Sequence, residues 1–439
     1  MSTAKHHESA LERAIGSFGF GVININSVIG AGIFGLPAAA AAASGAFSPW
    51  LFVIAGILVL TLVLSFAEAA SRFQRTGGVL AYASHAFGPF IGFQTGWLAY
   101  LSRVAAMGAN TNLLVTYASW FWPPLDSEPY RSITLTVLIG SLTWLNVVGV
   151  RNSVALLYAF TILKLLPLSL LLLLGMGKID SQLLLGAQWP ELGEFGDAIL
   201  LVLYAYVGFE GTVVNAGEGR DPRRDLPRAL IATIVIIGIV YVGVQIVAIS
   251  VLPGLSESSA ALADVAGVLI GPAGAAVLTL GAVFSIGGNL HSSLLSAPRM
   301  TFALAMDGSI PKWFCHVHPR HRTPDRSIWF YGALCLLMAL TGTFVWLAVI
   351  STLVRLLTYM VCIATLPQLR STIDDRADQF TLPGGLLIPA TAMLLCLWLI
   401  THAAPDAWVM TGAFVLAGTL LYTFSRKRAL SAPGNPEET

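Results

Sequence analysis

Long apolar stretches, separated by short polar connections, recur along the whole chain. A helix that crosses the hydrocarbon core of a bilayer needs about 20 predominantly apolar residues, and the chain holds about twelve stretches of this kind. The pattern predicts an all-α polytopic membrane protein. The expected spans are Ile15–Ala43, Pro49–Ser71, Phe87–Tyr117, Ser132–Gly149, Val154–Met176, Gly196–Asn215, Ala229–Leu252, Gly271–Ala305, Ser327–Gly342, Val345–Leu366, Leu382–Thr401 and Trp408–Phe424.

Glycine clusters interrupt two of these spans. The first span contains Gly30, Gly32 and Gly35, and the sixth contains Gly208 and Gly211. Because a helix in lipid must satisfy its backbone internally, such clusters are tolerated where the freed amides and carbonyls line a cavity. Breaks at matching positions in two halves of a membrane protein point to a transporter binding site at the midplane. Close packing of helices through small residues is the alternative.

The paired breaks also predict how the chain is organised. Two five-helix repeats are expected over residues 15–178 and 193–368, followed by two accessory helices over 381–425. Because each repeat has an odd number of spans, the second copy is inverted in the membrane. The remaining segments are an N-terminal tail, 1–14, and a C-terminal tail, 426–439, and no soluble domain is expected.

The charge distribution supports the membrane assignment and orients the chain. Hydrophobic residues make up 56% of the sequence and charged residues only 11%, against about 25% charged residues in soluble domains. The net charge is +1, but Lys and Arg gather in alternate connections, and only Arg131 and Lys178 fall on the other side. The positive-inside rule therefore predicts that both termini are cytoplasmic. Since the basic residues follow the topology, no nucleic-acid partner is expected.

Neither the N-terminal residues nor the cysteines indicate a targeting signal or a functional site. The first residues, Met1 to Arg13, are polar and include acids, so no cleavable signal peptide is expected. The four cysteines have neither metal nor disulfide spacing, and small buried hydrophobes are the expected role. No metal and no cofactor is predicted. The cysteines are Cys315, Cys335, Cys362 and Cys396.

The two breaks expose opposite polarities of the backbone. The second half-helix of the first span begins near Ile33, so its free amides and positive dipole end suit a carboxylate. In the sixth span, carbonyls near Tyr204, Ala205 and Val207 lose their helical partners and suit an ammonium group. An anion site that faces a cation site fits the zwitterion of an α-amino acid.

Lys164 lies deep in the fifth span. An ionisable residue at membrane depth is a functional candidate, and burial disfavours the charged form of an amine. Lys164 is therefore expected to take up and release a proton in the place that a sodium ion takes in sodium-driven relatives of this architecture. A static counter-charge for carbonyls of the broken first helix is the alternative.

Four further charges lie inside the spans, namely Arg103, Arg355, Glu68 and Glu210. Because isolated charges are costly in lipid, structural ion pairs are the first expectation. The alternative is that an arginine binds an acidic substrate side chain. Glu210, beside the second break, is the candidate for gating or substrate contact. Tyr204, Tyr206 and Phe209 flank the same break, where they either cover the ligand or pack in the core.

These residues also carry a family resemblance. Across nearly its full length the chain resembles the amino acid–polyamine–organocation (APC) superfamily, with loose motifs whose order and spacing together are specific. The first motif departs from the usual Gly-Ser-Gly at Ala31. In order, the motifs are Val28 to Phe34, Glu68 with Thr76 to Tyr82 and Phe87 to Pro89, Tyr206 to Glu210, Glu218 to Pro222 with Leu226 to Ala229, and Ser296 to Arg299 with Ala305 to Pro311.

The resemblance implies the fold of sodium-coupled leucine-type transporters, alternating access and amino-acid substrates. It implies that the backbone of Gly30, Ala31 and Gly32 binds the carboxylate. The backbone of Val28, Tyr204, Ala205 and Val207 would bind the amine, with Tyr204 as the gating aromatic. Lys164 matches the fifth-helix lysine of sodium-independent members.

Two more implications concern specificity and partners. Arg103 and Arg355 are placed like arginines of the cystine–glutamate exchanger. The cysteine that links a glycoprotein partner there would fall in the outer loop Trp120–Arg131, which has none, so no disulfide-linked heavy subunit is expected. The expected partners are an amino acid, protons and the lipid bilayer, for a monomer or homodimer.

The sequence thus predicts a secondary amino-acid permease in the plasma membrane, as in a bacterial inner membrane, that works as a proton-coupled symporter. Exchange of one amino acid for another, or for an amine, is the alternative mechanism. A sensor that binds without transport and a membrane-embedded enzyme are alternatives from other classes. The chain lacks the His-Glu-x-x-His and Gly-x-Ser-x-Gly motifs, so it is not expected to be an enzyme.

Overall fold

The structure is a computed structural model that describes residues 15–72, 78–149, 154–214, 216, 219–372 and 379–431. All regular secondary structure in these residues is helical, apart from one isolated bridge between Ile15 and Gly219. The predicted all-α class is therefore confirmed. The expected tails 1–14 and 432–439 lie outside the described residues, as do Arg75, Thr76, Gly77, Arg151 and Glu218.

The helices occupy each of the ranges in which a span was expected. They are α2 (Ser17–Val28), α3 (Gly32–Ser44), α4 (Ser48–Arg72), α5 (Gly78–Phe87), α6 (Pro89–Ala118), α7 (Tyr130–Val148), α8 (Val154–Gly175), α9 (Ser181–Leu185), α10 (Leu192–Leu203), α11 (Glu210–Val214), α12 (Pro222–Val251), α13 (Ala261–Met306), α14 (Asp325–Thr341), α15 (Phe344–Thr372), α16 (Leu387–Ile400) and α17 (Pro405–Ser431). Short 3₁₀ helices include η2 (Pro123–Asp126), η5 (Leu255–Glu257) and η6 (Lys312–Cys315).

Several boundaries differ from those expected. A separate helix, α5, precedes α6, so the third span begins at Pro89. α13 is bent where Gly271 adopts a positive φ of 74°, and the expected eighth span starts at this bend. α17 continues to Ser431, beyond the expected start of the C-terminal tail.

Seven helical stretches in the described residues are long and apolar enough to cross a membrane, and Leu387–Ile400 is a shorter apolar helix. One of the seven, Gly32–Arg72, joins α3 and α4. The protein is thus a multi-pass membrane protein. α6 has 30 residues but carries Gln94, Arg103 and Asn110, and its polarity explains why it falls outside this set.

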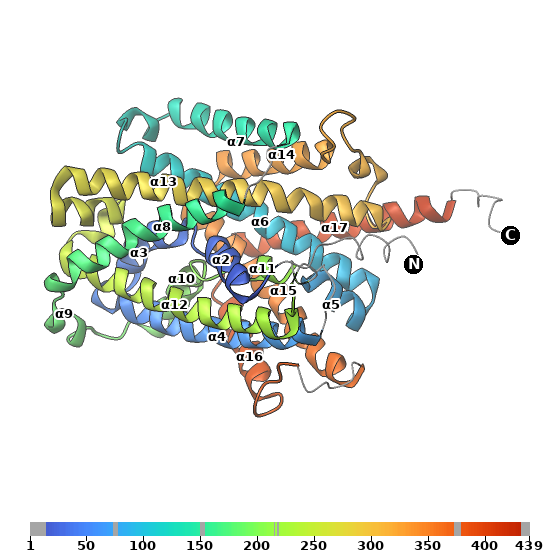
Figure 1. Ribbon diagram of the computed structural model, residues 1–439, viewed down its shortest axis with the longest axis horizontal. Helices are drawn as coiled ribbons and strands as arrows, with labels where there is room; N and C mark the ends of the chain where they lie inside the picture. The colour runs from blue at the N-terminus through green and yellow to red at the C-terminus, as the bar shows by residue number, and fades with distance from the viewer. Residues whose placement is uncertain are drawn as a thin grey trace.

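Most helices run along the long axis of the molecule (Figure 1). α4 packs against α12 on one side, and α7 packs against α14 on the opposite edge. The short helices α2, α10 and α11 lie near the centre, between these layers (Figure 1). The two broken stretches are therefore surrounded by longer helices.

The two ends of this axis differ in charge. α4, α13 and α15 finish at the end where α12 starts, which we call the basic end because its connections hold residues such as Arg223, Lys312 and Arg320. The opposite end, with η2, α9 and η5, is called the acidic end and holds Asp126 and Glu257.

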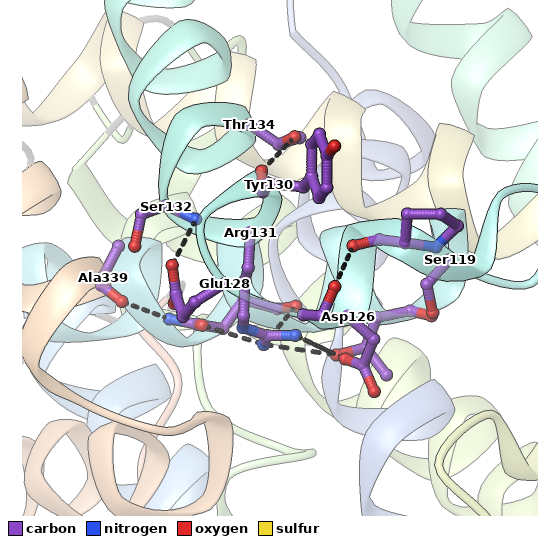
Figure 2. Close-up of polar contacts among 12 residues, drawn as sticks. Ser119, Asp126, Glu128, Tyr130, Arg131, Ser132, Thr134 and Ala339 are labelled. Atoms are coloured by element: carbon purple, nitrogen blue, oxygen red, sulfur yellow. Dashed lines mark hydrogen bonds and ion pairs between the residues drawn. The ribbon is translucent and has the colours of Figure 1, made fainter.

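At the acidic end, Arg131 joins three elements (Figure 2). Its guanidinium donates to Asp126 Oδ1 in η2 (2.7 Å) and to Asn112 Oδ1 in α6 (3.0 Å). Asn112 in turn donates to the carbonyl of Ala339 in α14 (2.9 Å). These contacts fix α6, α7 and α14 relative to one another on one side of the central helices.

Candidate substrate site at the two helix breaks

The first glycine cluster divides its apolar stretch into two helices. α2 ends at Val28, Ile29 is extended (φ −75°, ψ 96°), and α3 begins at Gly32. The first amides of a helix have no acceptor within that helix. α3 therefore presents free N–H groups and the positive end of its dipole at the break.

The second break separates α10, which ends at Leu203, from α11, which begins at Glu210. The amide of Tyr204 donates to the carbonyl of Leu201, three residues back (3.1 Å), so the chain leaves the α-helical pattern here. Gly208 has a φ of +118°, a conformation that other residues rarely adopt. The α-helical hydrogen-bond ladder stops, and carbonyls in this segment become available to other donors.

The two breaks touch each other, and glycine is needed at both contacts. A β-carbon at Gly32 would lie 2.6 Å from the Cα of Ala205. One at Gly208 would lie 2.5 Å from the carbonyl oxygen of Ser27. Because the close neighbours are backbone atoms, no side-chain rotation relieves these contacts. Opposite backbone polarities are thus held next to each other.

A small cavity of about 40 Å³ lies where the breaks meet. Every residue predicted to bind substrate through its backbone lines it except Ala205, which packs against Gly32 instead. The predicted residues in the lining are Val28, Gly30, Ala31, Gly32, Tyr204 and Val207. The other lining residues are Ser27, Ala106, Asn110, Asn289 and Arg355.

A second cavity of about 170 Å³ adjoins the first, and Ser27, Ala106, Asn110, Asn289 and Arg355 line both. It extends past Arg103 and Glu210 to Ser296 and Met300 on α13. Since α13 finishes at the basic end, this cavity leads from the helix breaks toward that end.

Two aromatic rings meet beside the small cavity, one from Tyr204 in its lining and one from Phe344 at the start of α15. The rings of Tyr204 and Phe344 meet edge to face, with centroids 6.0 Å apart. A β-carbon at Gly35 would lie 2.5 Å from the Phe344 ring, so this ring lies directly against α3. Tyr204 lines the small cavity, and its role as a covering aromatic stays a prediction, while Phe344, which was not predicted, packs against its ring.

Two asparagines that sequence reasoning missed connect the elements around the cavity. Tyr204 donates its hydroxyl hydrogen to Asn110 Oδ1 (2.6 Å), and Asn110 Nδ2 donates to Asn289 Oδ1 (2.9 Å). Asn289 Nδ2 reaches the carbonyl of Ser27 at the end of α2 (3.4 Å). Polar residues at mid-depth of α6 and α13 were the available signal, because buried amides in a membrane helix require partners.

Lys164 is 1% exposed and reaches the first break from α8. Its Nζ donates to the carbonyl of Ile29 (2.8 Å) and lies 3.5 Å from that of Asn26. Those carbonyls belong to the C-terminal end of α2, which carries the negative end of the helix dipole. A protonated amine at this position therefore compensates the broken helix, and neutralising it weakens the link between α8 and α2.

Glu210 and Arg355 form an ion pair beside the second break, with Nε 3.4 Å from Oε1 and both side chains 9% exposed. Glu210 Oε2 also accepts hydrogen bonds from the hydroxyl of Tyr359 (2.7 Å) and the amide of Gly208 (3.0 Å). The acid thus holds the turn of the second break and ties it to α15. Arg355 is largely neutralised where it lines both cavities.

Arg103 and Arg355 differ in their surroundings. Among the described residues, no carboxylate lies within 4.0 Å of the Arg103 guanidinium, whose NH1 donates to Ser296 Oγ (2.9 Å). Arg103 lines only the larger cavity, whereas Arg355 lines both. The expected ion pairing thus holds for Arg355 and not for Arg103.

Phe209 and Tyr206, two of the aromatic residues that flank the second break, pack in the core of the protein. Phe209 packs against Phe66 and Tyr359, with both centroid distances 5.2 Å, and lines neither cavity. Tyr206 donates its hydroxyl hydrogen to the carbonyl of Phe52 on α4 (2.8 Å). Tyr204 is the aromatic of this segment that contacts the small cavity.

Glu68 is fully buried and pairs away from the breaks. Arg370 contacts both of its carboxylate oxygens, each at 2.7 Å, and Arg72 Nε lies 3.2 Å from Oε1. The amide of Leu382 also donates to Oε2 (3.2 Å). This acid joins α4, α15 and the segment before α16 at the basic end.

The described residues contain no group of His, Cys, Asp or Glu side chains that could hold a metal ion. The cysteines are free, with Cys335, Cys362 and Cys396 buried and Cys315 partly buried. Their surroundings agree with the expected packing role.

Comparison with known proteins places this geometry in a family context. The model of a family described as "Amino acid permease" matches residues 15–424. The branched-chain amino acid permease BcaP of Bacillus subtilis (strain 168) is 27% identical, over 98% of this chain and 96% of its own length. The serine/threonine exchanger SteT of the same organism is 26% identical, over 97% and 99%.

A third relative is named for a ligand other than an amino acid. The methylthioribose transporter of Bacillus subtilis (strain 168) is 24% identical over 98% of this chain and 96% of its own length. These relatives are named as permeases, exchangers or transporters and not as enzymes. The expectation that the chain is not an enzyme is therefore confirmed.

Proposed function

The chain belongs to the amino acid permease family, and on that premise we propose that it is a secondary transporter that moves L-amino acids by alternating access. The observation that carries the proposal is the contact between two helix breaks of opposite backbone polarity around one small cavity. The substrate carboxylate binds the amides at Gly30, Ala31 and Gly32. The ammonium group binds carbonyls of Val28, Tyr204, Ala205 and Val207.

The proposed topology follows from the charge of the two ends. About twelve segments cross the membrane, arranged as two inverted five-helix repeats and two accessory helices, with both termini and the basic end in the cytoplasm. The larger cavity then leads to the cytoplasm, and Tyr204 and Phe344 close the site on the outer side. This arrangement corresponds to an inward-facing state of an alternating-access cycle.

The proposed substrates are neutral amino acids. Arg355, the arginine beside the small cavity, is compensated by Glu210, so an acidic side chain gains little there. Arg103 lines only the larger cavity, where its NH2 lies against Gly211 rather than at the small cavity. The relatives named for branched-chain residues and for serine and threonine agree with a neutral substrate.

The proposed coupling ion is a proton carried by Lys164. In its charged form the amine compensates carbonyls at the end of α2. Release of the proton removes that attraction, which allows α2 to move relative to α8 and opens or closes the path to the substrate. Exchange of internal for external amino acid remains the second candidate, favoured by the relative that is named an exchanger.

Uptake into proteoliposomes tests this function. Vesicles without internal amino acid are given an inward pH gradient and a labelled neutral amino acid such as leucine or serine. Symport predicts transient accumulation that collapses when a protonophore is added. Uptake that occurs only with amino acid inside assigns the exchange mechanism. No uptake of any amino acid in either arrangement rules out transport and leaves a binding-only role.

A further inference from the structure

A separate cavity of about 290 Å³ lies at the basic end, between the ends of α7 and α13 and the start of α14. It shares no lining residue with the two cavities at the helix breaks. α7 and α14 run side by side along one edge of the molecule, above α13 (Figure 1). The cavity is therefore at the periphery of the helix bundle and is independent of the amino-acid site.

The polar groups of this cavity are suited to an anion. Arg299 on α13 lines it, and its only described hydrogen bond goes to the carbonyl of Leu295 in the same helix. Among the described residues, no carboxylate lies within 4.0 Å of this guanidinium, and no acid lines the cavity. The charge of Arg299 is thus available to a ligand.

Asn146 gives an independent sign of a ligand. It lines the cavity from α7 and is 6% exposed, yet its amide nitrogen has no hydrogen-bond partner. A buried donor without an acceptor costs about 1–3 kcal/mol, so native proteins rarely leave one unfilled. An oxygen-rich anion in the cavity supplies the missing acceptor.

The loop over the cavity is held in place by its own hydrogen bonds. Thr323 Oγ1 donates to the carbonyl of Val147, near the end of α7 (2.7 Å), and the amide of His321 donates to His318 Nδ1 (3.2 Å). Gly149, with a φ of +84°, ends α7 directly beneath His321 and Thr323. These contacts keep His321 in the lining of the cavity.

Exposed aromatic residues place the cavity near a membrane surface. Trp144 on α7 is 56% exposed and Trp329 on α14 is 48% exposed, next to the exposed apolar residues Leu145 and Val148. Tryptophans of membrane proteins gather at the level of the lipid headgroups, and basic pockets between helices at this level bind anionic headgroups. A lipid phosphate at this depth is in reach of Arg299, while its acyl chains lie along the apolar surface of α7.

We propose that this cavity, formed by Asn146, Arg299 and His321, binds the phosphate of an anionic phospholipid. Inorganic phosphate offers the same oxygen chemistry without acyl chains. The lipid is favoured because the cavity adjoins exposed apolar surface and two interfacial tryptophans.

The test measures the binding of phosphatidylglycerol to the purified full-length chain in detergent by native mass spectrometry. Phosphatidylcholine with the same acyl chains serves as the zwitterionic comparison, and inorganic phosphate serves as the competitor. Arg299→Gln is expected to weaken phosphatidylglycerol binding about tenfold or more, because a charge-assisted hydrogen bond is lost. Arg299→Lys is expected to retain most of it. Arg320→Gln removes an exposed charge of the same loop outside the cavity and is expected to bind normally.

The outcomes are distinct. Lipid binding that phosphate does not displace supports the lipid as occupant, and displacement by phosphate at millimolar concentration supports the same anion site with a free ion as its ligand. Equal binding of phosphatidylcholine, or equal loss in Arg299→Gln and Arg320→Gln, overturns the proposal. If Arg299→Gln does not fold, Asn146→Asp introduces a repelling carboxylate at the same cavity, and unchanged lipid binding in that variant also overturns it.

Discussion

At the scale of single residues, function here depends on backbone atoms that glycines bring together. Gly32 and Gly208 are the positions at which a β-carbon would meet backbone of the opposite break. The sequence identified both glycines as interruptions, because glycine in an apolar helix is costly without a reason. It did not reveal that the two breaks touch, since that contact depends on how distant helices pack.

Gly32→Ala tests this contact. The added carbon would lie 2.6 Å from the Cα of Ala205 and push the breaks apart. Overpacking of this kind shifts the backbone. Because the displaced amides and carbonyls then fit one zwitterion less well, we expect amino-acid binding to weaken about tenfold or more. The affinity for a labelled amino acid is measured in detergent by a scintillation proximity assay.

Gly287→Ala is the matched control for this substitution. Gly287 is a helical glycine in α13 with open space around its β-carbon position. We expect normal binding in this variant. Equal binding by Gly32→Ala and Gly287→Ala would mean that the close approach of the breaks is not needed for the substrate.

Lys164→Ala tests proton coupling. The variant loses the hydrogen bond to the carbonyl of Ile29 and the only titratable group at that position. We expect accumulation driven by a pH gradient to be lost, while part of the substrate binding remains. Lys178→Ala, which changes an exposed lysine just after α8, is expected to accumulate substrate normally. Unchanged driven uptake in Lys164→Ala would remove this lysine from the coupling mechanism.

At the scale of elements, buried polar contacts decide which helices act together. Asn24 on α2 hydrogen-bonds to Thr233 of α12, and Thr212 of α11 donates to Asn24 Oδ1 (3.1 Å). α2, α11 and α12 are thus linked to one another. Arg131 and Asn112 together link α6, α7 and α14 in the same way (Figure 2). Asn110 of α6 and Asn289 of α13 connect the second group to the end of α2.

Glu68 is expected to stabilise the basic end by fixing α4 to α15. Removing one partner of a buried ion pair costs about 3–5 kcal/mol, because the other charge stays buried without compensation. Glu68→Gln should therefore lower the free energy of unfolding by about this amount, seen as a lower thermal midpoint in detergent. The exposed pair of Asp221 and Arg224, 4.0 Å apart, provides the control, since Asp221→Asn should cost less than about 1 kcal/mol.

A double variant separates the ion pair from other effects of the substitution. Glu68→Gln combined with Arg370→Gln removes both charges of the closest pair. The loss of stability in the double variant should be smaller than the sum of the two single losses. Additive losses would show that the pair itself contributes nothing.

Among the elements, the sequence predicts the positions of the membrane helices better than the turns and contacts between them. A helix occurs in every range where the apolar pattern predicted a span, because membrane helices are encoded by local composition. The pattern did not predict α5 (Gly78–Phe87), which a turn at Gly88 with a positive φ of 84° separates from α6. The sequence also did not identify the ion-pair partners of Arg355 and Glu68, because these pairs join helices that are far apart in sequence.

At the scale of the whole molecule, the proposed state of the transporter is open toward the basic end. The larger cavity extends from the helix breaks along α13, and the rings of Tyr204 and Phe344 pack against each other beside the small cavity. Both the cytoplasmic placement of the basic end and the inverted repeats stay predictions. Charge asymmetry is the basis of the cytoplasmic placement. The matching breaks and the odd number of spans per repeat are the basis of the inverted repeats.

Cysteine labelling tests the orientation and the open cavity together. In a chain whose four cysteines are replaced, Ser296→Cys in the larger cavity and Thr134→Cys on exposed α7 near the acidic end are compared. A membrane-impermeant maleimide should label Ser296→Cys in inside-out vesicles and Thr134→Cys in intact cells. The reverse pattern would place the basic end outside the cell.

The central claim is that the paired breaks bind the zwitterionic part of an amino acid, which is then carried across the membrane. Its most direct measurement is the inhibition of labelled leucine or serine uptake into proteoliposomes by analogues of the same substrate. We predict that analogues without the carboxylate, and analogues without the ammonium group, inhibit at least about tenfold more weakly than the unlabelled amino acid. Inhibition by either analogue as strong as that by the amino acid itself would contradict the account.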